Sequence, residues 1–271
     1  MESLADQVRA ALRQQLLGDK LLGIREVPMA SPAAAVNPRV QRTAVDATRP
    51  SPTEPRTAGF ARRDDGASLP TAEKVRRLRA LDDTKVKGCT RCELSKHRTQ
   101  TVFGQGNPDA RLVFVGEGPG YQEDQQGLAF VGEAGQVLTR MIVAMGLTRD
   151  DVYICNVVKC RPPGNRTPMA DEILACHPYL REQLEVIQPE MIVALGAPAA
   201  KTLLNTADAI GKLRGRFHTY YYSGVSGNGP STPLMPTYHP AYLLRNPSDK
   251  GKVWEDLQKV MAELGLSRGG A

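Results

Sequence analysis

Four of the five cysteines have a spacing that suits metal ligation. Two residues separate Cys89 from Cys92, another 67 residues lead to Cys160, and 15 more lead to Cys176. Without a secretory signal before them, ligation of a metal is favoured over a framework of disulfides. A zinc ribbon more usually repeats the close pair, so the scattered second half favours an iron–sulfur cluster held by four thiolates. We expect the fifth, Cys155, to be a buried free thiol.

A glycine-rich turn follows the first apolar run of the domain. Gly116-Glu-Gly-Pro-Gly120 permits a sharp turn and a close approach of the backbone to a ligand, with amide groups available to an anion. Its spacing fits neither a Walker loop nor the dinucleotide fingerprint. A plain strand-to-helix turn is the alternative. The acidic pair Glu123 and Asp124 directly after the turn favours a functional site.

Two further segments carry polar side chains after predicted strands. Asn156 offers both an acceptor and a donor, which suits the imide edge of a pyrimidine, although it could equally tie two loops together. Beside it, Lys159, Arg161 and Arg166 are expected to add charge for phosphate groups. His239 is placed to donate a hydrogen bond to charge developing on a substrate oxygen, a core histidine being the alternative.

The remaining candidate residues follow His239 or stand alone. Leu244 and Arg245 could wedge a base stack open, although leucines at the start of a helix are more often core residues. His97, His177 and His218 have no comparable setting, and we expect them to be structural or exposed.

Strands must alternate with helices to position these side chains. Strands are predicted at 112–115, 152–158, 191–195 and 234–238. Helices are predicted over 70–88, 135–145, 168–187, 197–204 and 249–264. In the first, Val75, Leu78 and Leu81 are predicted to form an apolar stripe. In the third, Thr167 and Pro168 are the expected cap and first-turn proline, and Pro178 is expected to kink or restart the helix. This order predicts a three-layer α/β/α sandwich around a mostly parallel four-stranded sheet. In such sheets, ligands bind beyond the carboxyl ends of the strands.

The chain before residue 70 has a different composition. Residues 1–28 are predicted to form an amphipathic helix, residues 29–69 a disordered Pro- and Ala-rich linker, and residues 70–271 the folded domain. The formal net charge of +6 makes an anionic partner plausible. No apolar run is long enough to span a membrane, so we expect an intracellular, cytoplasmic protein.

Taken together, these motifs resemble the family 4 uracil-DNA glycosylases, the iron–sulfur branch of the uracil-DNA glycosylase superfamily. The resemblance covers about residues 75–265 and consists of several motifs in order: GEGPG-x2-ED, FVG, NVVKCRPPGNR, the distal cysteine, IVALG and YHPAYLLRNP. It implies hydrolysis of the N-glycosidic bond of deoxyuridine in DNA, which releases uracil and leaves an abasic site during base excision repair. The target base must leave the stack for this reaction.

The resemblance also implies roles for residues. Phe130 would stack on the extruded uracil, Asn156 would read its polar edge, and backbone at Glu117 and Gly118 would complete the floor. His239 would stabilise negative charge on uracil O2, and Glu123 would position or activate water and favour the cationic sugar. Asp124 stays an alternative carboxylate. Leu244 and Arg245, with Arg166 nearby, would contact DNA, and Cys89, Cys92, Cys160 and Cys176 would hold a structural 4Fe-4S cluster.

Several functional alternatives stay open. A relative that kept the fold and cluster but served as a non-catalytic DNA-binding or damage-sensing module of replication would bind DNA without releasing uracil. An iron–sulfur electron carrier would not need Asn156 or His239. We expect a monomer that acts on uracil-containing DNA, single- or double-stranded. Contact with a replication or repair partner is one expected function of the N-terminal extension.

Overall fold

A computed structural model describes residues 69–224 and 229–267, which belong to one compact unit, Thr57–Ala271. The N-terminal helix expected over 1–28 and nearly all of the linker expected over 29–69 lie outside the described residues. The domain boundary at residue 70 therefore stays a prediction.

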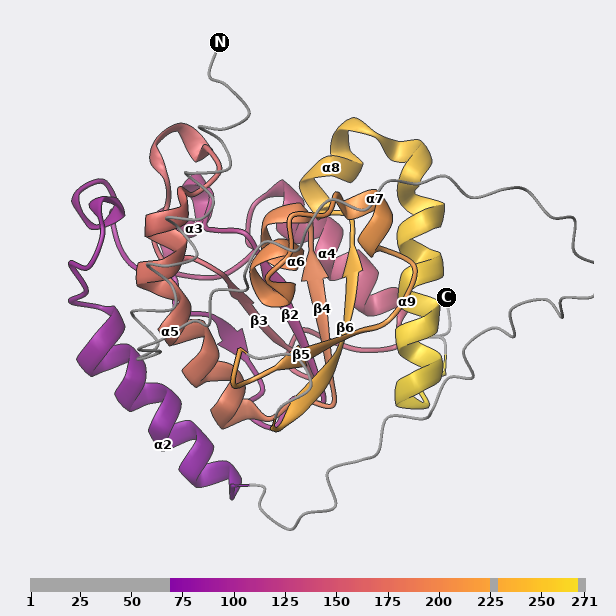
Figure 1. Cartoon of the computed structure of the whole chain (residues 1–271), viewed down its shortest axis with the longest axis horizontal. Coiled ribbons are helices and arrows are strands. Elements are labelled where there is room, and N and C mark those ends of the chain that lie inside the picture. The colour runs from indigo at the N-terminus through magenta and orange to yellow at the C-terminus, as the bar shows by residue number, and fades with distance from the viewer. Residues whose placement is uncertain (1–68, 225–228, 268–271) are drawn as a thin grey trace, which may run out of the picture. The chain divides into compact units, whose positions relative to one another are not determined.

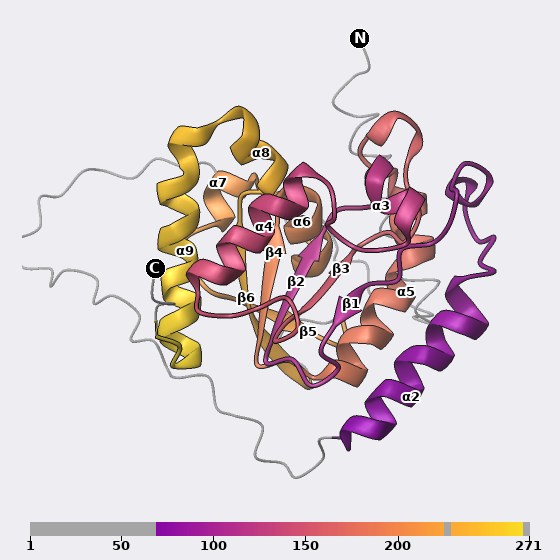
Figure 2. The same ribbon diagram turned by 180° about the vertical axis from the view of Figure 1, so that it is seen from behind.

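The centre of the domain is a six-stranded sheet in the order β1-β3-β2-β4-β6-β5 (Figures 1 and 2). The inner strands β3, β2, β4 and β6 are parallel, whereas β1 and β5 pair antiparallel at the edges. The predicted mostly parallel sheet is confirmed, and sequence missed only its edges. Their bounds are β1 Gln105–Gly106, β2 Leu112–Gly116, β3 Tyr153–Asn156, β4 Met191–Leu195, β5 His218–Tyr221 and β6 Ser231–Thr237.

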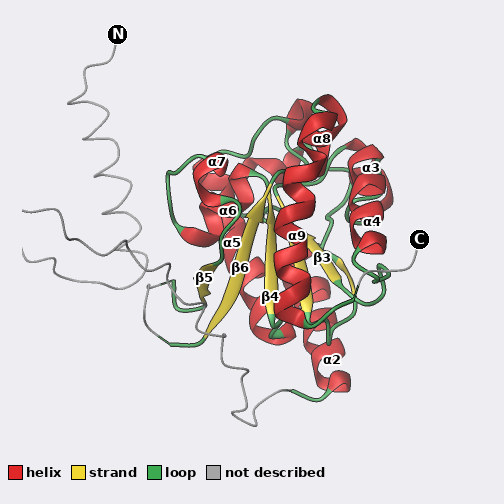
Figure 3. Ribbon diagram, turned by 90° about the vertical axis from the view of Figure 1, so that its right-hand side faces the viewer, coloured by secondary structure: helices red, strands yellow, loops and turns green. Residues whose placement is uncertain are grey.

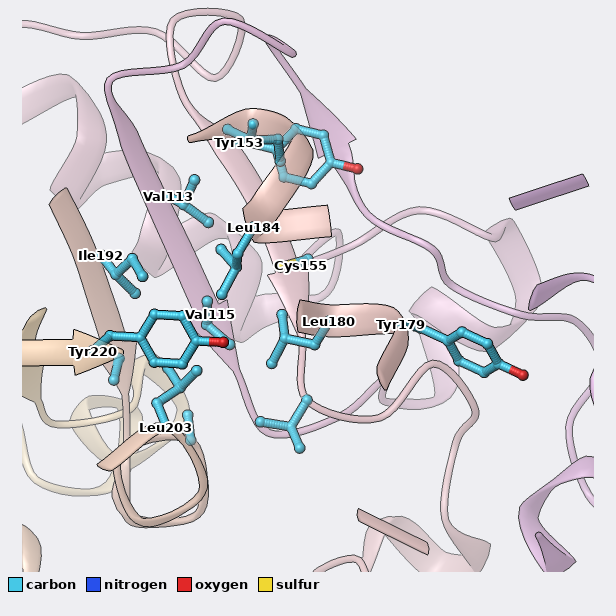
Figure 4. Close-up of a cluster of buried hydrophobic side chains, with 14 of the residues drawn as sticks. Val113, Val115, Tyr153, Cys155, Tyr179, Leu180, Leu184, Ile192, Leu203 and Tyr220 are labelled. Atoms are coloured by element: carbon cyan, nitrogen blue, oxygen red, sulfur yellow. The ribbon is translucent and has the colours of Figure 1, made fainter. Parts of the chain in front are cut away.

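Alternating side chains of the inner strands supply two separate cores. Val113 and Ile192 face a core shared with α5 and α6, while Phe114 and Val193 face one shared with α4 and α9. Every residue of β2 and β4 is buried, as expected for strands covered on both faces. Figure 3 shows the sheet between α9 on one side and α5 and α6 on the other. Figure 4 shows Cys155 within the first core, so the predicted buried thiol is confirmed.

The five predicted helices are present with some shifts at their ends, whereas the short helices α3, α7 and α8 lie outside the predicted ranges. Their bounds are α2 Thr71–Leu81, followed by a π-helical turn Asp82–Val86, α3 Tyr121–Gln126, α4 Glu133–Ala144, α5 Ala170–Ile187, α6 Ala197–Leu204, α7 Ile210–Leu213, α8 Pro240–Arg245 and α9 Lys250–Leu264. Short 3-10 turns lie at Glu93–Lys96, Pro163–Asn165 and Pro247–Asp249. None of the helices in the described residues has the length and apolar character to cross a membrane.

Three local predictions about helices are wrong. Thr167 does not cap α5, because the helix begins at Ala170 and the Glu172 side chain accepts a hydrogen bond from the Met169 amide at 2.7 Å. The chain does not restart at Pro178, which lies within one continuous helix. Val75 is exposed rather than part of the apolar stripe of α2, since the buried residue beside Leu78 is Lys74.

Candidate active site

The predicted site residues follow the carboxyl ends of the inner strands. Glu117 follows β2, Asn156 ends β3, and His239 follows β6, so parallel pairing brings them to one edge of the sheet. Figures 1 and 2 show α3 and α8 at this same edge. The glycine-rich turn is fastened to the Asn segment, because the Val157 and Val158 amides donate to the Gly116 and Glu117 carbonyls at 2.9 and 3.1 Å.

Phe130 lies at the centre of the site. Its ring centroid is 5.6 Å from that of His239. A Cβ added at Gly116 would lie 2.5 Å from the Phe130 ring and 2.4 Å from Asn156 Oδ1, so the ring and the amide both pack against this glycine. Phe130 has a φ of 54°, an uncommon conformation for a bulky residue and one that clusters at functional sites. The three predicted groups Phe130, Asn156 and His239 are therefore brought together.

Asn156 presents an acceptor that no group in the described part of the chain uses. The residue is 1% exposed, and among the described residues its Oδ1 atom has no hydrogen-bond partner. Buried amide oxygens are almost always paired, because an unpaired one costs about 1–3 kcal/mol. An unpaired acceptor next to an aromatic ring is the arrangement expected of a site that awaits an N–H donor from a planar ligand.

His239 is held as a neutral hydrogen-bond donor. Its Nδ1 accepts from the Ala241 amide at 3.1 Å, which leaves the proton on Nε2. Burial, together with a smaller effect of the charge of Arg245, lowers the pKa of His239 to about 4, and Glu123 opposes this shift. Gly196 after β4 makes room for it, since a Cβ there would lie 2.9 Å from His239 Cβ. Nε2 can thus donate to a substrate oxygen near neutral pH.

The two carboxylates of the acidic pair have different partners. Glu123 accepts hydrogen bonds from the Gly120 amide at 3.1 Å and from the Val131 and Gly132 amides at 2.8 Å. It therefore joins the glycine-rich turn to the segment that carries Phe130. Asp124 is buried and accepts from the Thr99 amide at 2.9 and 3.1 Å. Asp124 holds a neighbouring loop.

Glu117 and Gly118, the predicted floor of the site, lie in the turn that packs against the Asn segment. A Cβ at Gly118 would lie 2.8 Å from Val158 Cγ2, so a larger residue would push the turn away from the Asn segment. Burial raises the pKa of the half-buried Glu117, against an opposing hydrogen bond with Thr167.

Some residues expected to contact a nucleic acid are exposed, whereas others are buried or already paired within the protein. Leu244 is 44% exposed and Arg245 is exposed, whereas Leu243 beside them is buried. Arg166 forms a bidentate ion pair with Glu172 at 2.7 and 2.8 Å, so its guanidinium already has an anion. The interpretation of Lys159 as a phosphate contact is wrong, because it is 1% exposed.

Sequence reasoning missed one surface pair beside the site. The Arg161 guanidinium lies 5.1 Å from the ring centroid of Tyr121, which is 57% exposed. Tyr121 is the first residue after the glycine-rich turn and Arg161 follows the Asn segment, so the turn-to-strand packing brings them together. No sequence pattern marks a tyrosine after a Gly-rich turn as a functional residue.

The four predicted metal ligands share one pocket. Cys89, Cys92, Cys160 and Cys176 line it together with Arg98, Lys159 and Tyr179. Three sulfurs accept hydrogen bonds, namely Cys89 from Tyr179 Oη at 3.2 Å, Cys160 from Arg98 Nη1 at 3.1 Å and Cys176 from the Lys159 amide at 3.2 Å.

Burial makes the thiolate forms of these cysteines unfavourable unless a cation is bound. Burial raises the pKa of Cys92, of Cys160 and, to about 12, of Cys176. Thiolates here therefore need a bound positive charge to form near neutral pH. Within the described ranges, no three His, Cys, Asp or Glu side chains are arranged to hold a single metal ion. The donor set nevertheless fits a group that four thiolates hold together.

Comparisons with known proteins agree with this geometry. The model of the family described as "Uracil DNA glycosylase superfamily" matches residues 103–258. A "Type-4 uracil-DNA glycosylase" of Thermotoga maritima is 48% identical over 68% of this chain and 93% of its own length. Proteins of the same name from Saccharolobus solfataricus and Archaeoglobus fulgidus are 45% and 41% identical, over 66% and 68% of this chain and 83% and 92% of their own lengths.

Proposed function

The chain belongs to the uracil DNA glycosylase superfamily, and from that premise we propose that it is a uracil-DNA glycosylase of the type-4 branch. It hydrolyses the N-glycosidic bond of deoxyuridine in DNA, releasing uracil and leaving an abasic site for base excision repair. The observation that carries the proposal is the buried, unpartnered Asn156 Oδ1 beside the Phe130 ring, with the His239 donor next to that ring.

Recognition of the base follows from these three side chains. Uracil extruded from the stack would lie against Phe130, with its N3–H donated to Asn156 Oδ1. The backbone of Glu117 and Gly118 would form the floor. Thymine and uracil share this imide edge, so Asn156 distinguishes them from cytosine, which has no N3–H.

The bond breaks so that electrons move toward the base. The N1–C1′ electron pair leaves with uracil, while positive charge develops on the deoxyribose. Water then bonds to C1′, and the proton that it loses passes through solvent to the uracil anion. His239 Nε2–H stabilises the charge on uracil O2, and this donor becomes stronger as that oxygen becomes negative. Glu123 supplies negative charge that favours the cationic sugar. Because three amides already occupy its carboxylate, we assign it electrostatic and positioning roles rather than proton abstraction.

We propose that DNA crosses the edge of the sheet between two exposed groups. Leu244 fills the space left by the extruded base, and Arg245 contacts a phosphate. On the other side, Tyr121 with Arg161 offers an exposed aromatic face to a neighbouring base. Arg166 supports the loop through Glu172 and contributes less to DNA binding than its charge alone indicates.

Cys89, Cys92, Cys160 and Cys176 would hold a 4Fe-4S cluster. The shared pocket and the hydrogen bonds to three of the sulfurs support this assignment. When bound, the cluster supplies a structural cross-link, since hydrolysis transfers no electrons. These residues would then tie the loop before β1 to the segment after Asn156.

The remaining expectations extend the proposal to the whole chain. We propose a monomer that acts on DNA in the cytoplasm. The N-terminal extension, residues 1–69, would be the place of contact with a replication or repair partner.

A uracil-excision assay tests the proposal. Purified protein is incubated with an oligonucleotide containing one deoxyuridine, and free uracil and alkali-labile strand breaks are measured in parallel. Equal amounts of both are expected, with none from the matched cytosine oligonucleotide. Binding of the uracil-containing strand without release of uracil would favour the non-catalytic damage-sensing alternative.

A further inference from the structure

A buried lysine lies between the thiol pocket and the residue that reads the base. Lys159 is 1% exposed and lines the pocket of the four cysteines. Its Nζ donates to the backbone oxygen of Asn156 at 2.8 Å, while its own amide donates to Cys176 Sγ at 3.2 Å. One residue thus contacts both a predicted cluster ligand and the base-reading segment.

Among the described residues, Lys159 has no carboxylate within ion-pair distance of its ammonium, although the charge of Asp82 acts on it from farther away. Besides Asn156, the ammonium donates to Gln183 Oε1, and it lies 6.0 Å from the ring centroid of Phe103. Gln183 is itself fully buried and donates to the Phe103 backbone oxygen at 2.9 Å. Burying this ammonium carries a large desolvation cost, which the negative charge of Asp82 and of the neighbouring cysteine sulfurs offsets only in part. An apolar side chain of similar length would avoid this cost, so stability of the core does not explain a lysine here.

The hydrogen bond from Lys159 to the Asn156 carbonyl restrains the backbone at the end of β3. Asn156 is the last residue of β3, and the amide of the peptide that follows it, that of Val157, already donates to the Gly116 carbonyl at 2.9 Å. The Lys159 ammonium binds the carbonyl end of the same peptide, and the two hydrogen bonds together limit its rotation. That restraint also fixes the direction in which the Asn156 side chain leaves the backbone, toward Gly116 and Phe130.

We propose that Lys159 is a positioning residue for uracil recognition. It holds the Asn156 backbone so that Oδ1 meets the N3–H of the base, and it fixes this segment to the cysteine pocket through Cys176. The inference rests on the proposed function and deepens it, because it assigns the orientation of the Asn156 side chain to a second, buried residue.

The test compares Lys159→Met with Lys74→Met. Lys74 is also a buried lysine, 4% exposed, whose Nζ donates to a backbone oxygen, that of Ile187, at 3.0 Å, and it belongs to α2 away from the site. We expect Lys159→Met to weaken inhibition by free uracil and to lower kcat/KM about 10- to 100-fold, since small misplacements of a positioning group have effects of this size. Lys74→Met should change neither by more than about threefold.

A double-mutant cycle shows whether Lys159 acts through Asn156. In an Asn156→Ala background, Lys159→Met should produce no further loss of uracil affinity, because the positioned group is gone. Iron content per chain and the circular dichroism spectrum are measured for each variant. If Lys159→Met is insoluble, Lys159→Gln, which keeps an N–H donor, takes its place and should show a smaller loss in the same direction.

Two outcomes would overturn the inference. One is unchanged inhibition by uracil in a folded Lys159 variant, and the other is an equal loss in the Asn156→Ala background. Wild-type protein is assayed first, because failure of the wild type to release uracil rejects the proposed function rather than the role of Lys159.

Discussion

At the residue scale, the protonation state of His239 decides how the site stabilises a leaving base. Its Nδ1 accepts from the Ala241 amide, so an imidazole with a proton on Nε2 fits the site without becoming cationic. A neutral donor avoids a buried positive charge before reaction and still responds to negative charge on the oxygen it faces.

We predict that His239→Ala lowers kcat about 10²- to 10³-fold, the usual effect of removing one such donor. Burial lowers the pKa of His239 to about 4, so the residue stays neutral at higher pH. The ratio of wild-type to variant kcat should therefore be constant from about pH 6 to about pH 8. A ratio that falls as pH rises through about 6.5 would show that the imidazolium is the active form.

The same shift has a consequence for stability. Because the folded-state pKa lies below the ordinary value of about 6.5, the unfolded chain binds the proton more readily. The contribution of His239 to the free energy of unfolding is therefore present above about pH 6.5 and is lost as pH falls toward 4.

Glu123 and Asp124 are adjacent but should differ in variants. We predict that Glu123→Gln lowers kcat and raises KM together, because an amide can no longer accept all three backbone donors and the Phe130 segment loosens. Asp124→Asn keeps an acceptor for the Thr99 amide and should stay within about threefold of wild-type kcat/KM. Steady-state kinetics of both variants check this, and the reverse ranking would make Asp124 the key carboxylate.

At the scale of elements, α8 places two consecutive leucines in different environments. Leu243 is 2% exposed and packs into the core with α4 and α9, while Leu244 is 44% exposed. Sequence left open whether both belonged to the core. Alternation on a six-residue helix could not be resolved without knowing which face meets α4.

Paired alanine variants test this division. Leu244→Ala should leave the melting temperature unchanged and lower excision from duplex DNA more than from a single strand, because only the duplex must be wedged open. Leu243→Ala should instead lower the free energy of unfolding by about 2–5 kcal/mol. Thermal unfolding and excision from both substrates provide the readouts. Equal loss on both substrates in Leu244→Ala would contradict a wedge.

Sequence predicted the inner strands because continuous apolar runs are typical of strands buried on both faces. It missed β1 and β5, since β1 has only two residues and β5 has a polar, part-exposed pattern. It also could not predict the buried carboxylate of Asp256, which accepts from Thr237 Oγ1 at 2.7 Å and pairs with Arg214 at 2.8 Å. This tertiary contact fixes the end of β6 before His239, and no local pattern encodes it.

The site was predictable to a similar degree. The motif residues Phe130, Asn156 and His239 meet as expected, because parallel strands bring the loops after them to one edge. Lys159 was misread as a surface cation since its charge suggests exposure, whereas its burial depends on α5 and the segment near Phe103.

At the scale of the whole molecule, the cysteine pocket joins segments that are far apart in sequence. We predict that Cys176→Ser abolishes bound iron and visible absorbance and lowers the melting temperature. Cys155→Ala, a change at the buried thiol within β3, should retain full iron. Metal analysis and absorbance check both, and stoichiometric zinc in wild-type protein would contradict the cluster assignment.

The central claim is that Asn156 Oδ1 accepts a hydrogen bond from the N3–H of an extruded uracil. Inhibition of excision by free bases measures this hydrogen bond most directly. Uracil and 1-methyluracil, which both keep N3–H, should inhibit excision with similar constants, whereas 3-methyluracil should bind more than about tenfold more weakly because the buried oxygen stays unpaired. In Asn156→Ala, the difference between the two methylated bases should disappear. Equal inhibition of the wild-type protein by 1-methyluracil and 3-methyluracil would contradict the account.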